Sequence, residues 1–180
     1  KLIAPDQSKM KSLASLKPPT SFTQLKSFLG SVNFVVNHLE GIKDHMAVLF
    51  SLTRDNKEFQ WSEEAQNSYD SIIAAIENHQ KLYVLDYNNV AILSIDSSLT
   101  AAGGILAQIH PQTGKYMVNS YYQKLFSVQE GKLMNFEREA LGLVSIYKMA
   151  AITVFGCSLC IVSDCRAVLS LKYLSNQSHK

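Results

Sequence analysis

The sequence has no long apolar run and almost no excess of charge of either sign. No apolar stretch approaches the roughly 18 residues that cross a bilayer, so a membrane-spanning protein is not expected. The segment that opens at Lys1 is polar and helix-like, which argues against a signal peptide. With 17 basic and 15 acidic residues the net charge is only +2. Any nucleic-acid binding must therefore come from local clusters and not from bulk charge.

Cysteine is scarce as well, with three residues that lie close together, Cys157, Cys160 and Cys165. An odd and clustered set argues against a disulfide framework and favours a reducing compartment. Cys157 and Cys160 form a CxxC pair, but a zinc site needs a second pair of ligands, and no nearby His or Cys pair supplies one. Ordinary packing is the favoured interpretation, with Cys160 facing a layer of a sheet.

Apolar side chains are plentiful, at 47% of 180 residues, which is enough for a packed core in one ordinary domain or two small ones. The sequence does not begin with Met, so we expect a fragment of a longer chain. The first half predicts helices, because apolar residues recur at helical spacing over 6–16 and 42–53 and after Ser62. Ser21, with Gln24 three residues later, fits a capping box at the start of another helix.

The character of the sequence changes near residue 80, where strand signals begin. Apolar runs predict strands over residues 91–96, 101–109, 116–123 and 159–164. A long helix is expected from about 129 to 150, and a short one over 166–174. One face of the long helix carries Phe136, Ala140, Val144 and Tyr147. A meander of three strands, a helix, a parallel strand and another helix predicts an α/β fold with a mixed sheet and flanking helices.

Three acidic residues occupy positions that suit a metal site. Asp96 and Asp164 each end a predicted strand, and Glu139 lies in the first turns of the long helix. If the two strands are parallel neighbours, both aspartates reach the sheet edge where open α/β sheets bind ligands, and a helix packed on the sheet can bring Glu139 to the same corner. Carboxylates gathered in this way repel one another unless a cation is bound. Two ions such as Mg²⁺ can promote hydrolysis of a phosphodiester.

Each of the three also has an ordinary structural interpretation. Strand-end aspartates often cap turns, and a glutamate on a helix is usually solvated. Glu137 competes with Glu139 for the same role, since both lie in the first turns, where acidic side chains are favoured in any case.

Several segments, in order along the chain, resemble the C-terminal part of a reverse transcriptase from a long-terminal-repeat retrotransposon of the Ty3/gypsy type. In that family the polymerase thumb leads into an RNase H domain. Pro18-Pro19-Thr20 and the segment that follows resemble the thumb, and Ser94-Ile95-Asp96-Ser97-Ser98 resembles the first RNase H strand. The matching segments are residues 3–10, 18–20, 25–34, 59–66, 94–98, 103–108, 137–144 and 162–169.

The resemblance implies a helical thumb-like segment over residues 1–80 and an RNase H-like domain over 81–180 that lacks its C-terminal part. It implies metal-dependent cleavage of RNA in RNA–DNA hybrids, with Mg²⁺ or Mn²⁺ held by the catalytic residues Asp96, Glu139 and Asp164. The polymerase palm and fingers of the same polyprotein are the implied partners, and cytoplasmic retroelement particles are the implied location. The basic residues expected to contact the hybrid are Lys17, Lys26, Lys115, Lys124 and Arg166, although each could instead be a solvated surface charge.

The sequence also departs from that family's pattern. A fourth catalytic Asp belongs to a later segment, which this chain does not reach. Cys165 stands where a His is common, Ile95 stands where a Thr is usual, and residues 34–37 are neutral where basic residues are usual. A second interpretation therefore stays open, that of a non-catalytic binding or assembly module. It could be a retroelement remnant taken over by its host, with a protein partner and a location in the nucleus as well as the cytoplasm.

Overall fold

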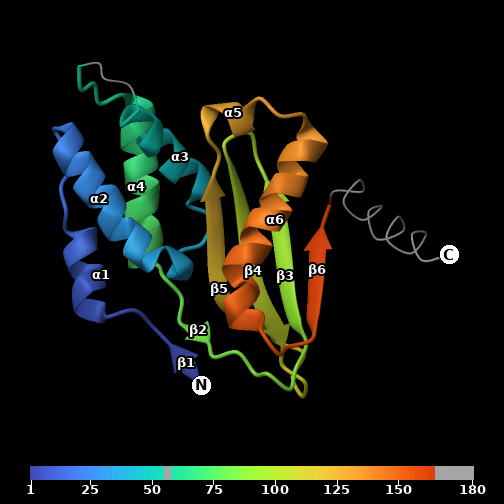
Figure 1. Ribbon diagram of the computed structural model, residues 1–180. Coiled ribbons are helices and arrows are strands. Elements are labelled where there is room, and N and C mark those ends of the chain that lie inside the picture. Colours follow the sequence, from blue (N-terminus) through green and yellow to red (C-terminus); the bar gives the residue numbers. More distant parts are fainter. Residues whose placement is uncertain (55–57, 165–180) are drawn as a thin grey trace. The chain divides into compact units, whose positions relative to one another are not determined.

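The computed structural model describes residues 1–54 and 58–164, and the chain divides into two compact units, Lys1–Val84 and Leu85–Lys180 (Figure 1). The boundary expected from the sequence lay between residues 80 and 81. The helix expected over residues 166–174 lies outside the described residues.

The first unit is helical in its described part. Its elements are β1 (Leu2–Ile3), α1 (Gln7–Ala14), α2 (Phe22–Val35), the 3₁₀ turn η1 (Val36–His38), α3 (Lys43–Leu52), α4 (Glu63–Glu77) and β2 (Leu82–Tyr83). β1 pairs antiparallel with β2, so the two ends of this unit are joined by backbone hydrogen bonds. Apolar side chains at helical spacing on α2, α3 and α4 are fully buried, among them Leu25, Met46 and Ile72. They form a core of the kind that helical periodicity predicts.

Side-chain caps begin these helices where the sequence indicates. The Ser21 hydroxyl accepts a hydrogen bond from the Gln24 N–H at 3.3 Å, and the Ser62 hydroxyl accepts one from the Ala65 N–H at 3.2 Å. Ser21 is therefore the N-cap of α2, as the sequence predicted, and Ser62 is the N-cap of α4. The Gln24 side chain does not complete the capping box on Ser21, because its Oε1 accepts from the Thr20 N–H at 2.8 Å instead.

The second unit is a mixed sheet with helices, which confirms the predicted α/β class. Its elements are β3 (Ala91–Ser97), β4 (Ala101–Ile109), β5 (Tyr116–Leu125), α5 (Val128–Gly131), α6 (Asn135–Val154) and β6 (Leu159–Ser163). The strand order is β5-β4-β3-β6, with β3, β4 and β5 in an antiparallel meander and β6 parallel to β3. Figure 1 shows α6 lying across one face of this sheet. No helix among the described residues has both the length and the apolar character to cross a bilayer.

The long helix predicted from about residue 129 is two helices in the structure. The Ser127 hydroxyl accepts a hydrogen bond from the Glu130 N–H, and the Glu130 carboxylate accepts one from the Ser127 N–H, so this capping box starts α5. α5 ends at Gly131, and α6 begins at Asn135. The prediction merged the two because both segments carry helix-forming residues.

The apolar face that the sequence shows on the long helix is not its buried face. Phe136, Val144 and Tyr147 are 50%, 45% and 43% exposed. The buried stripe of α6 is instead Arg138, Gly142, Ile146, Ala150 and Val154. This stripe packs on Ala91, Leu93 and Ile95 of β3 and their neighbours on β4. Because α6 lies close to the strands, small residues such as Gly142 and Ala150 form part of its contact with the sheet. The larger apolar side chains of Phe136, Val144 and Tyr147 lie on the exposed face of α6.

Two glycines permit that close approach. A Cβ on Gly142 of α6 would overlap Ser97 Oγ and lie 2.8 Å from Ala102 Cβ. A Cβ on Gly104 of β4 would overlap the Ile146 side chain of α6. The packing of α6 therefore depends on hydrogen at both positions, and it brings the first turns of α6 against the end of β3.

Alanine at Gly142 should destabilise the protein even though alanine is the better helix former. We expect Gly142→Ala to lower the free energy of unfolding by about 1–3 kcal/mol, because Ser97 and Ala102 must move. The matched control is Gly30→Ala in α2, where an added Cβ meets nothing within 4 Å. It should raise stability by up to about 1 kcal/mol. Urea unfolding of both variants measures the difference, and equal shifts would contradict the packing argument.

Candidate carboxylate site

Asp96 and Asp164 lie side by side at the carboxyl ends of two parallel strands. Side chains alternate along β3, so the buried Leu93 and Ile95 face α6 and the exposed Asp96 points to the opposite face. In the pairing of β3 with β6, Ile95 is opposite Ser163. Asp96 and Asp164 are the next residues on each chain, and both are exposed. The two carboxylates therefore share a face and a level, as the sequence predicted for adjacent parallel strands.

β4, the strand on the other side of β3, leaves space next to Asp96. The cross-strand partner of Asp96 on β4 is Gly103, which carries no side chain. A ligand of the two carboxylates would meet backbone on that side and no bulky group.

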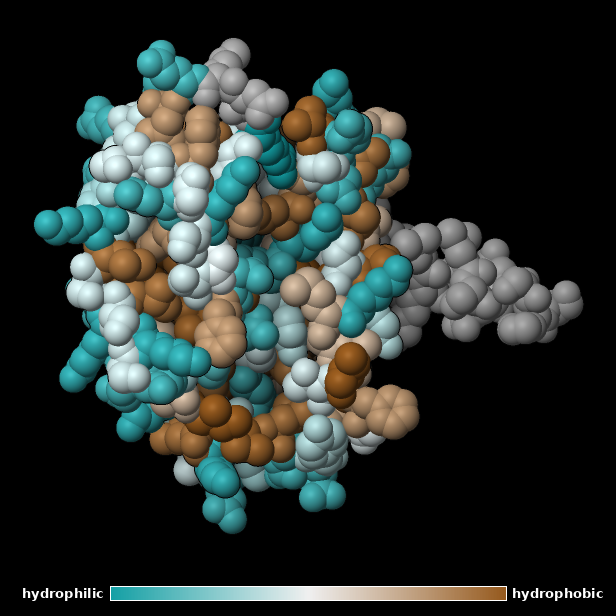
Figure 2. All heavy atoms as spheres, turned by 60° about the vertical axis from the view of Figure 1, so that its left-hand side comes forward, coloured by the Kyte–Doolittle hydropathy of each residue, from teal (hydrophilic) through white to brown (hydrophobic). Residues whose placement is uncertain are grey.

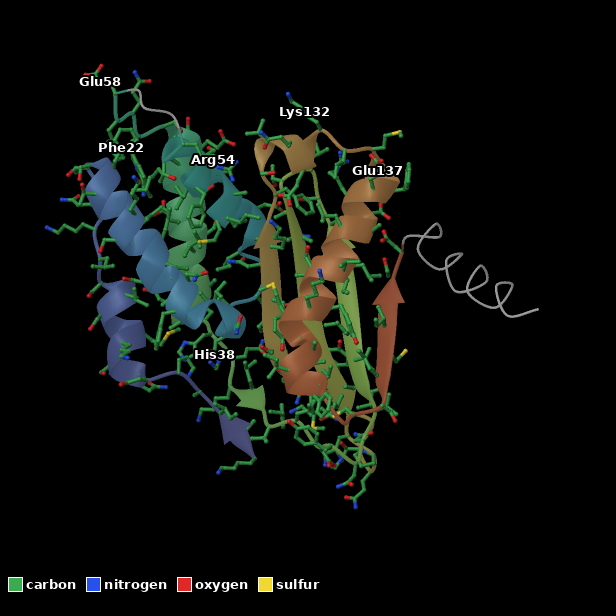
Figure 3. The ribbon with its side chains drawn as sticks, viewed as in Figure 1. Phe22, His38, Arg54, Glu58, Lys132 and Glu137 are labelled. Carbon is green, nitrogen blue, oxygen red and sulfur yellow. The ribbon has the colours of Figure 1, made fainter. Side chains whose placement is uncertain are left out.

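Glu139 lies at the same end of this unit but on the helix that covers the other face. Figure 1 shows that α6 begins at the end of the sheet where β3 and β6 finish, and Figure 3 labels Glu137 there. Glu139 is half-buried, one helical turn before Gly142, which packs on Ser97, the residue after Asp96. Its Oε1 accepts a hydrogen bond from Asn135 Nδ2 at 2.7 Å.

The structure separates the two competing glutamates. Glu137 Oε2 accepts a hydrogen bond from the Met134 backbone N–H at 2.9 Å, so this carboxylate satisfies an N–H at the start of α6. Glu139 instead accepts from the side chain of Asn135, the first residue of α6, and not from a backbone N–H. This difference favours Glu139 as the residue with a role beyond the fold.

A site for a divalent cation is incomplete in this arrangement. Within residues 1–54 and 58–164, no group of three or more His, Cys, Asp or Glu side chains is gathered closely enough to hold a metal ion. Register brings Asp96 and Asp164 together, whereas Glu139 approaches from the α6 side of the sheet. Oxygen ligands from carboxylates do suit Mg²⁺ or Mn²⁺. The pair on the strands thus fits part of such a site, and the sharing of ions among all three residues stays a prediction.

The predicted nucleic-acid contacts have different surroundings. Lys17, Lys26 and Lys115 are exposed, whereas Lys124 lies with its Nζ 3.3 Å from the Glu130 carboxylate. Arg166 lies outside the described residues. The face drawn in Figure 2 mixes hydrophilic and hydrophobic residues and shows no single hydrophilic tract. Cys160, expected to face a layer of the sheet, is exposed on the edge strand β6, because nothing described covers that side.

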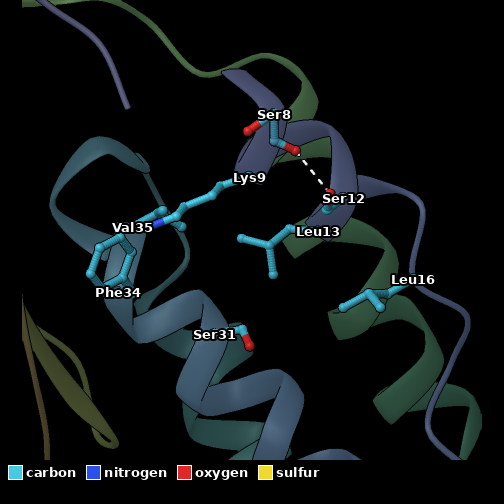
Figure 4. A pocket seen from close by; sticks show the side chains of 8 residues that line it. All are labelled: Ser8, Lys9, Ser12, Leu13, Leu16, Ser31, Phe34 and Val35. Atoms are coloured by element: carbon cyan, nitrogen blue, oxygen red, sulfur yellow. Dashed lines mark hydrogen bonds between the residues drawn. The ribbon is translucent and has the colours of Figure 1, made fainter. Parts of the chain in front are cut away.

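The helical unit contains a cavity that the sequence did not suggest. It has a volume of about 450 Å³ and lies between α1 and α2, as Figure 4 shows. Its lining includes Ser8, Lys9, Leu13, Ser31 and Phe34, with Lys9 Nζ 4.6 Å from the centre of the Phe34 ring. No carboxylate lines it, so this cavity is not a second candidate for a metal site.

Comparison with known proteins points to one family. The family described as "RNase H-like domain found in reverse transcriptase" matches residues 61–161. The Gag-Pol polyprotein of woolly monkey sarcoma virus is 31% identical over 93 residues, which is 52% of this chain and 6% of that protein. The Pol polyprotein from transposon 412 of Drosophila melanogaster is 21% identical over 178 residues, which is 99% of this chain and 14% of that protein. The chain therefore spans a small fraction of these relatives.

Solved structures show the same fold. The foamy viral protease–reverse transcriptase in complex with double-stranded DNA superposes with a TM-score of 0.75 at 16% identity, over 93% of this chain and 29% of that chain. The same viral protein in complex with an RNA/DNA hybrid gives a TM-score of 0.73 at 17% identity, over 97% of this chain and 24% of that chain. At these identities the likeness concerns the fold.

The capping glutamate of α5 should make stability depend on pH. Its hydrogen bond from the Ser127 N–H, helped by Lys124, lowers the pKa of Glu130 below its ordinary value. A carboxyl whose pKa is lower in the folded state stabilises the fold above its unfolded pKa, and this stabilisation is lost as the pH falls through the folded pKa. We expect Glu130→Gln to be less stable than the parent chain at pH 7 and equal to it in strong acid. Urea unfolding across pH measures this, and a difference that is constant with pH would contradict it.

Proposed function

Because the chain belongs to the family of RNase H-like domains found in reverse transcriptases, we propose that its α/β unit is a metal-dependent nuclease that cleaves RNA in RNA–DNA hybrids. The observation that carries the proposal is the side-by-side position of Asp96 and Asp164 at the ends of β3 and β6. The first turns of α6, with Glu139, lie at the same end of the unit.

The parent protein would be the Pol polyprotein of a Ty3/gypsy-type retrotransposon, with the helical unit as the polymerase thumb. Coverage supports a transposon over a retrovirus. The transposon 412 and Tf2-3 polyproteins match 99% and 80% of this chain, whereas two retroviral Gag-Pol polyproteins match 52% and 50%. The palm and fingers of that polyprotein would be its partners, and cytoplasmic particles its location.

In this proposal the residues of the chain bind the cation and the hybrid. Asp96 and Asp164 would supply carboxylate oxygens from one face of the sheet, and the second oxygen of Glu139 would be the ligand from α6. A bound Mg²⁺ or Mn²⁺ would activate a water and stabilise the leaving oxygen of the phosphodiester. The exposed Lys17, Lys26 and Lys115 would contact the phosphates of a hybrid that is recognised by its shape. Lys124 contributes less, because it is paired with Glu130.

One observation favours a second candidate, a non-catalytic RNase H-like module. No described group of three acidic or other ligating side chains could hold a metal ion. A host-domesticated remnant would keep the fold for packing against a protein partner, and it could act in the nucleus. Metal binding separates the two candidates.

We expect millimolar Mn²⁺ or Mg²⁺ to raise the melting temperature of the chain, because an ion that binds only the folded state stabilises that state by mass action. Asp96→Asn and Asp164→Asn should each abolish this rise. The matched control is Asp70→Asn, which changes an exposed carboxylate on α4 and should leave the rise intact. Differential scanning calorimetry measures all four proteins. Weak sites bind such metals only at millimolar concentrations. If the melting temperature of the parent chain does not change in about 10 mM metal, the non-catalytic module is favoured.

Cleavage is the direct test in the intact polyprotein. Asp96→Asn should reduce Mg²⁺-dependent cleavage of a labelled RNA–DNA hybrid by about a hundredfold or more, because it removes a metal ligand. The Asp70→Asn enzyme serves again as the control. Unchanged cleavage by Asp96→Asn would end the catalytic proposal.

A further inference from the structure

A groove runs between α1 and α2 in the helical unit. The cavity of about 450 Å³ beside Lys9 and Phe34 adjoins a second cavity of about 490 Å³, because Leu16 and Ser31 line both. The second cavity lies against the connection between the two helices, which carries Lys17. Cavities that hold ligands have volumes of about 300–1,000 Å³, so each of the two is large enough for part of a ligand. Together they are called the α1–α2 groove below.

Apolar side chains line the groove, and some of them stay open to water. Leu13 and Val35 are buried, whereas Leu16 is 45% exposed and Phe34 is 73% exposed. Figure 4 shows Leu13 of α1 and Ser31 of α2 directed toward the same space. Apolar side chains that gather at a hollow in the surface are typical of a site that takes up an apolar group from a ligand.

The hydroxyl groups along the groove can accept hydrogen bonds, but they already donate their own hydrogens. Ser8 Oγ donates to Asp6 Oδ1 at 2.7 Å. Ser12 Oγ donates to the Ser8 carbonyl at 2.9 Å, and Ser31 Oγ donates to the Ser27 carbonyl at 3.0 Å. A hydroxyl has one hydrogen and two lone pairs, so these side chains offer lone pairs to a ligand. A ligand that matches them carries N–H or O–H donors.

The charge near the groove is positive, in contrast to the rest of the chain. Residues 1–35 carry five lysines and one acidic residue, Asp6, whereas the other residues carry 12 basic and 14 acidic side chains. Lys9 and Lys17 line the groove, and no Asp or Glu of the described residues does so. Asp6 is the N-cap of α1, where its carboxylate accepts from the Ser8 N–H at 2.8 Å. Charge complementarity therefore favours a ligand with negative groups.

We propose that the α1–α2 groove binds an acidic peptide segment that also carries apolar side chains. The apolar side chains of the peptide enter the two cavities, its backbone N–H groups donate to the serine hydroxyls, and its carboxylates lie near Lys9 and Lys17. A peptide of this kind supplies the apolar body, the donors and the negative charge together. The inference goes beyond the proposed nuclease and does not depend on it.

A nucleic acid matches the groove less well, although Lys17 is also a predicted contact of the hybrid. The phosphates of a nucleic acid are negative, but their oxygens only accept hydrogen bonds and would face the lone pairs of the serine hydroxyls. Single strands are commonly bound by bases that stack on aromatic side chains. One face of the exposed Phe34 ring is already covered by Lys9, whose Nζ lies 4.6 Å from the ring centre.

The probe for this site is a short capped peptide that alternates leucine and glutamate, titrated into the full ¹⁵N-labelled chain. In ¹H–¹⁵N spectra the backbone amides of α1 and α2 should shift as the peptide reaches about 1 mM. Peptides with lysine in place of glutamate, or serine in place of leucine, should leave these amides unchanged. Absence of any shift with the leucine–glutamate peptide at that concentration would overturn the proposal.

Two variants test whether the peptide lies in the groove. Lys9→Gln removes a cation that lines it and should weaken binding by about two- to fivefold, the range open to an exposed ion pair. Ser31→Leu fills the place where the two cavities meet and should abolish binding. Lys11→Gln on α1 and Ser71→Leu on α4 are the matched controls and should bind as the parent does, since neither residue lines the groove. Parent-like affinity in Ser31→Leu would overturn the proposal.

Two further probes test the other occupants. Single-stranded oligodeoxythymidylate carries negative charge on a nucleic-acid backbone, and hexanoate carries a carboxylate and an apolar body without any N–H group. Both should bind the groove more weakly than the peptide. Tighter binding of the oligonucleotide to the same amides would identify a nucleic-acid site instead, and hexanoate that binds as tightly as the peptide would show that peptide donors are not recognised. Either result would overturn the proposal.

Discussion

The close packing of α6 on the sheet is the constraint on which the candidate site depends. Gly142 allows α6 to lie against Ser97 and Ala102, and Gly104 leaves room on β4 for the Ile146 side chain of α6. A wider separation would move the first turns of α6 away from the end of β3. The position of Glu139 relative to Asp96 thus depends on two glycines that carry no Cβ.

Much of the fold could be predicted from the sequence. The alternation and length of the apolar runs indicated the strands of the second unit, and the order of elements indicated that the last strand is parallel. That β6 lies beside β3 was a condition of the sequence argument, and the structure meets it. With these two strands as neighbours, the alternation of side chains puts Asp96 and Asp164 on one face. Strand periodicity carries this information directly, since a shift of one residue would move every side chain to the other face.

The helix at the site was harder to predict. Its buried stripe consists of an arginine, a glycine, an alanine and two branched apolar residues, which carry a weak hydrophobic signal. Phe136, Val144 and Tyr147 carry a stronger signal on a face that is exposed, so hydrophobicity alone does not identify the buried stripe. The roles of Glu137 and Glu139 likewise depend on which hydrogen bonds form at the start of α6, and those follow from where the helix begins.

The fold and the family of this chain are established, whereas its chemistry depends on whether three carboxylates share a cation. Two of them are adjacent by register, and the third accepts a hydrogen bond from Asn135 on the neighbouring helix. The most direct measurement is anomalous X-ray diffraction from crystals of the chain grown with Mn²⁺. The account predicts an anomalous peak within ligand distance, about 2.0–2.6 Å, of oxygens from both Asp96 and Asp164. Saturating Mn²⁺ with no peak at the ends of β3 and β6 would contradict it.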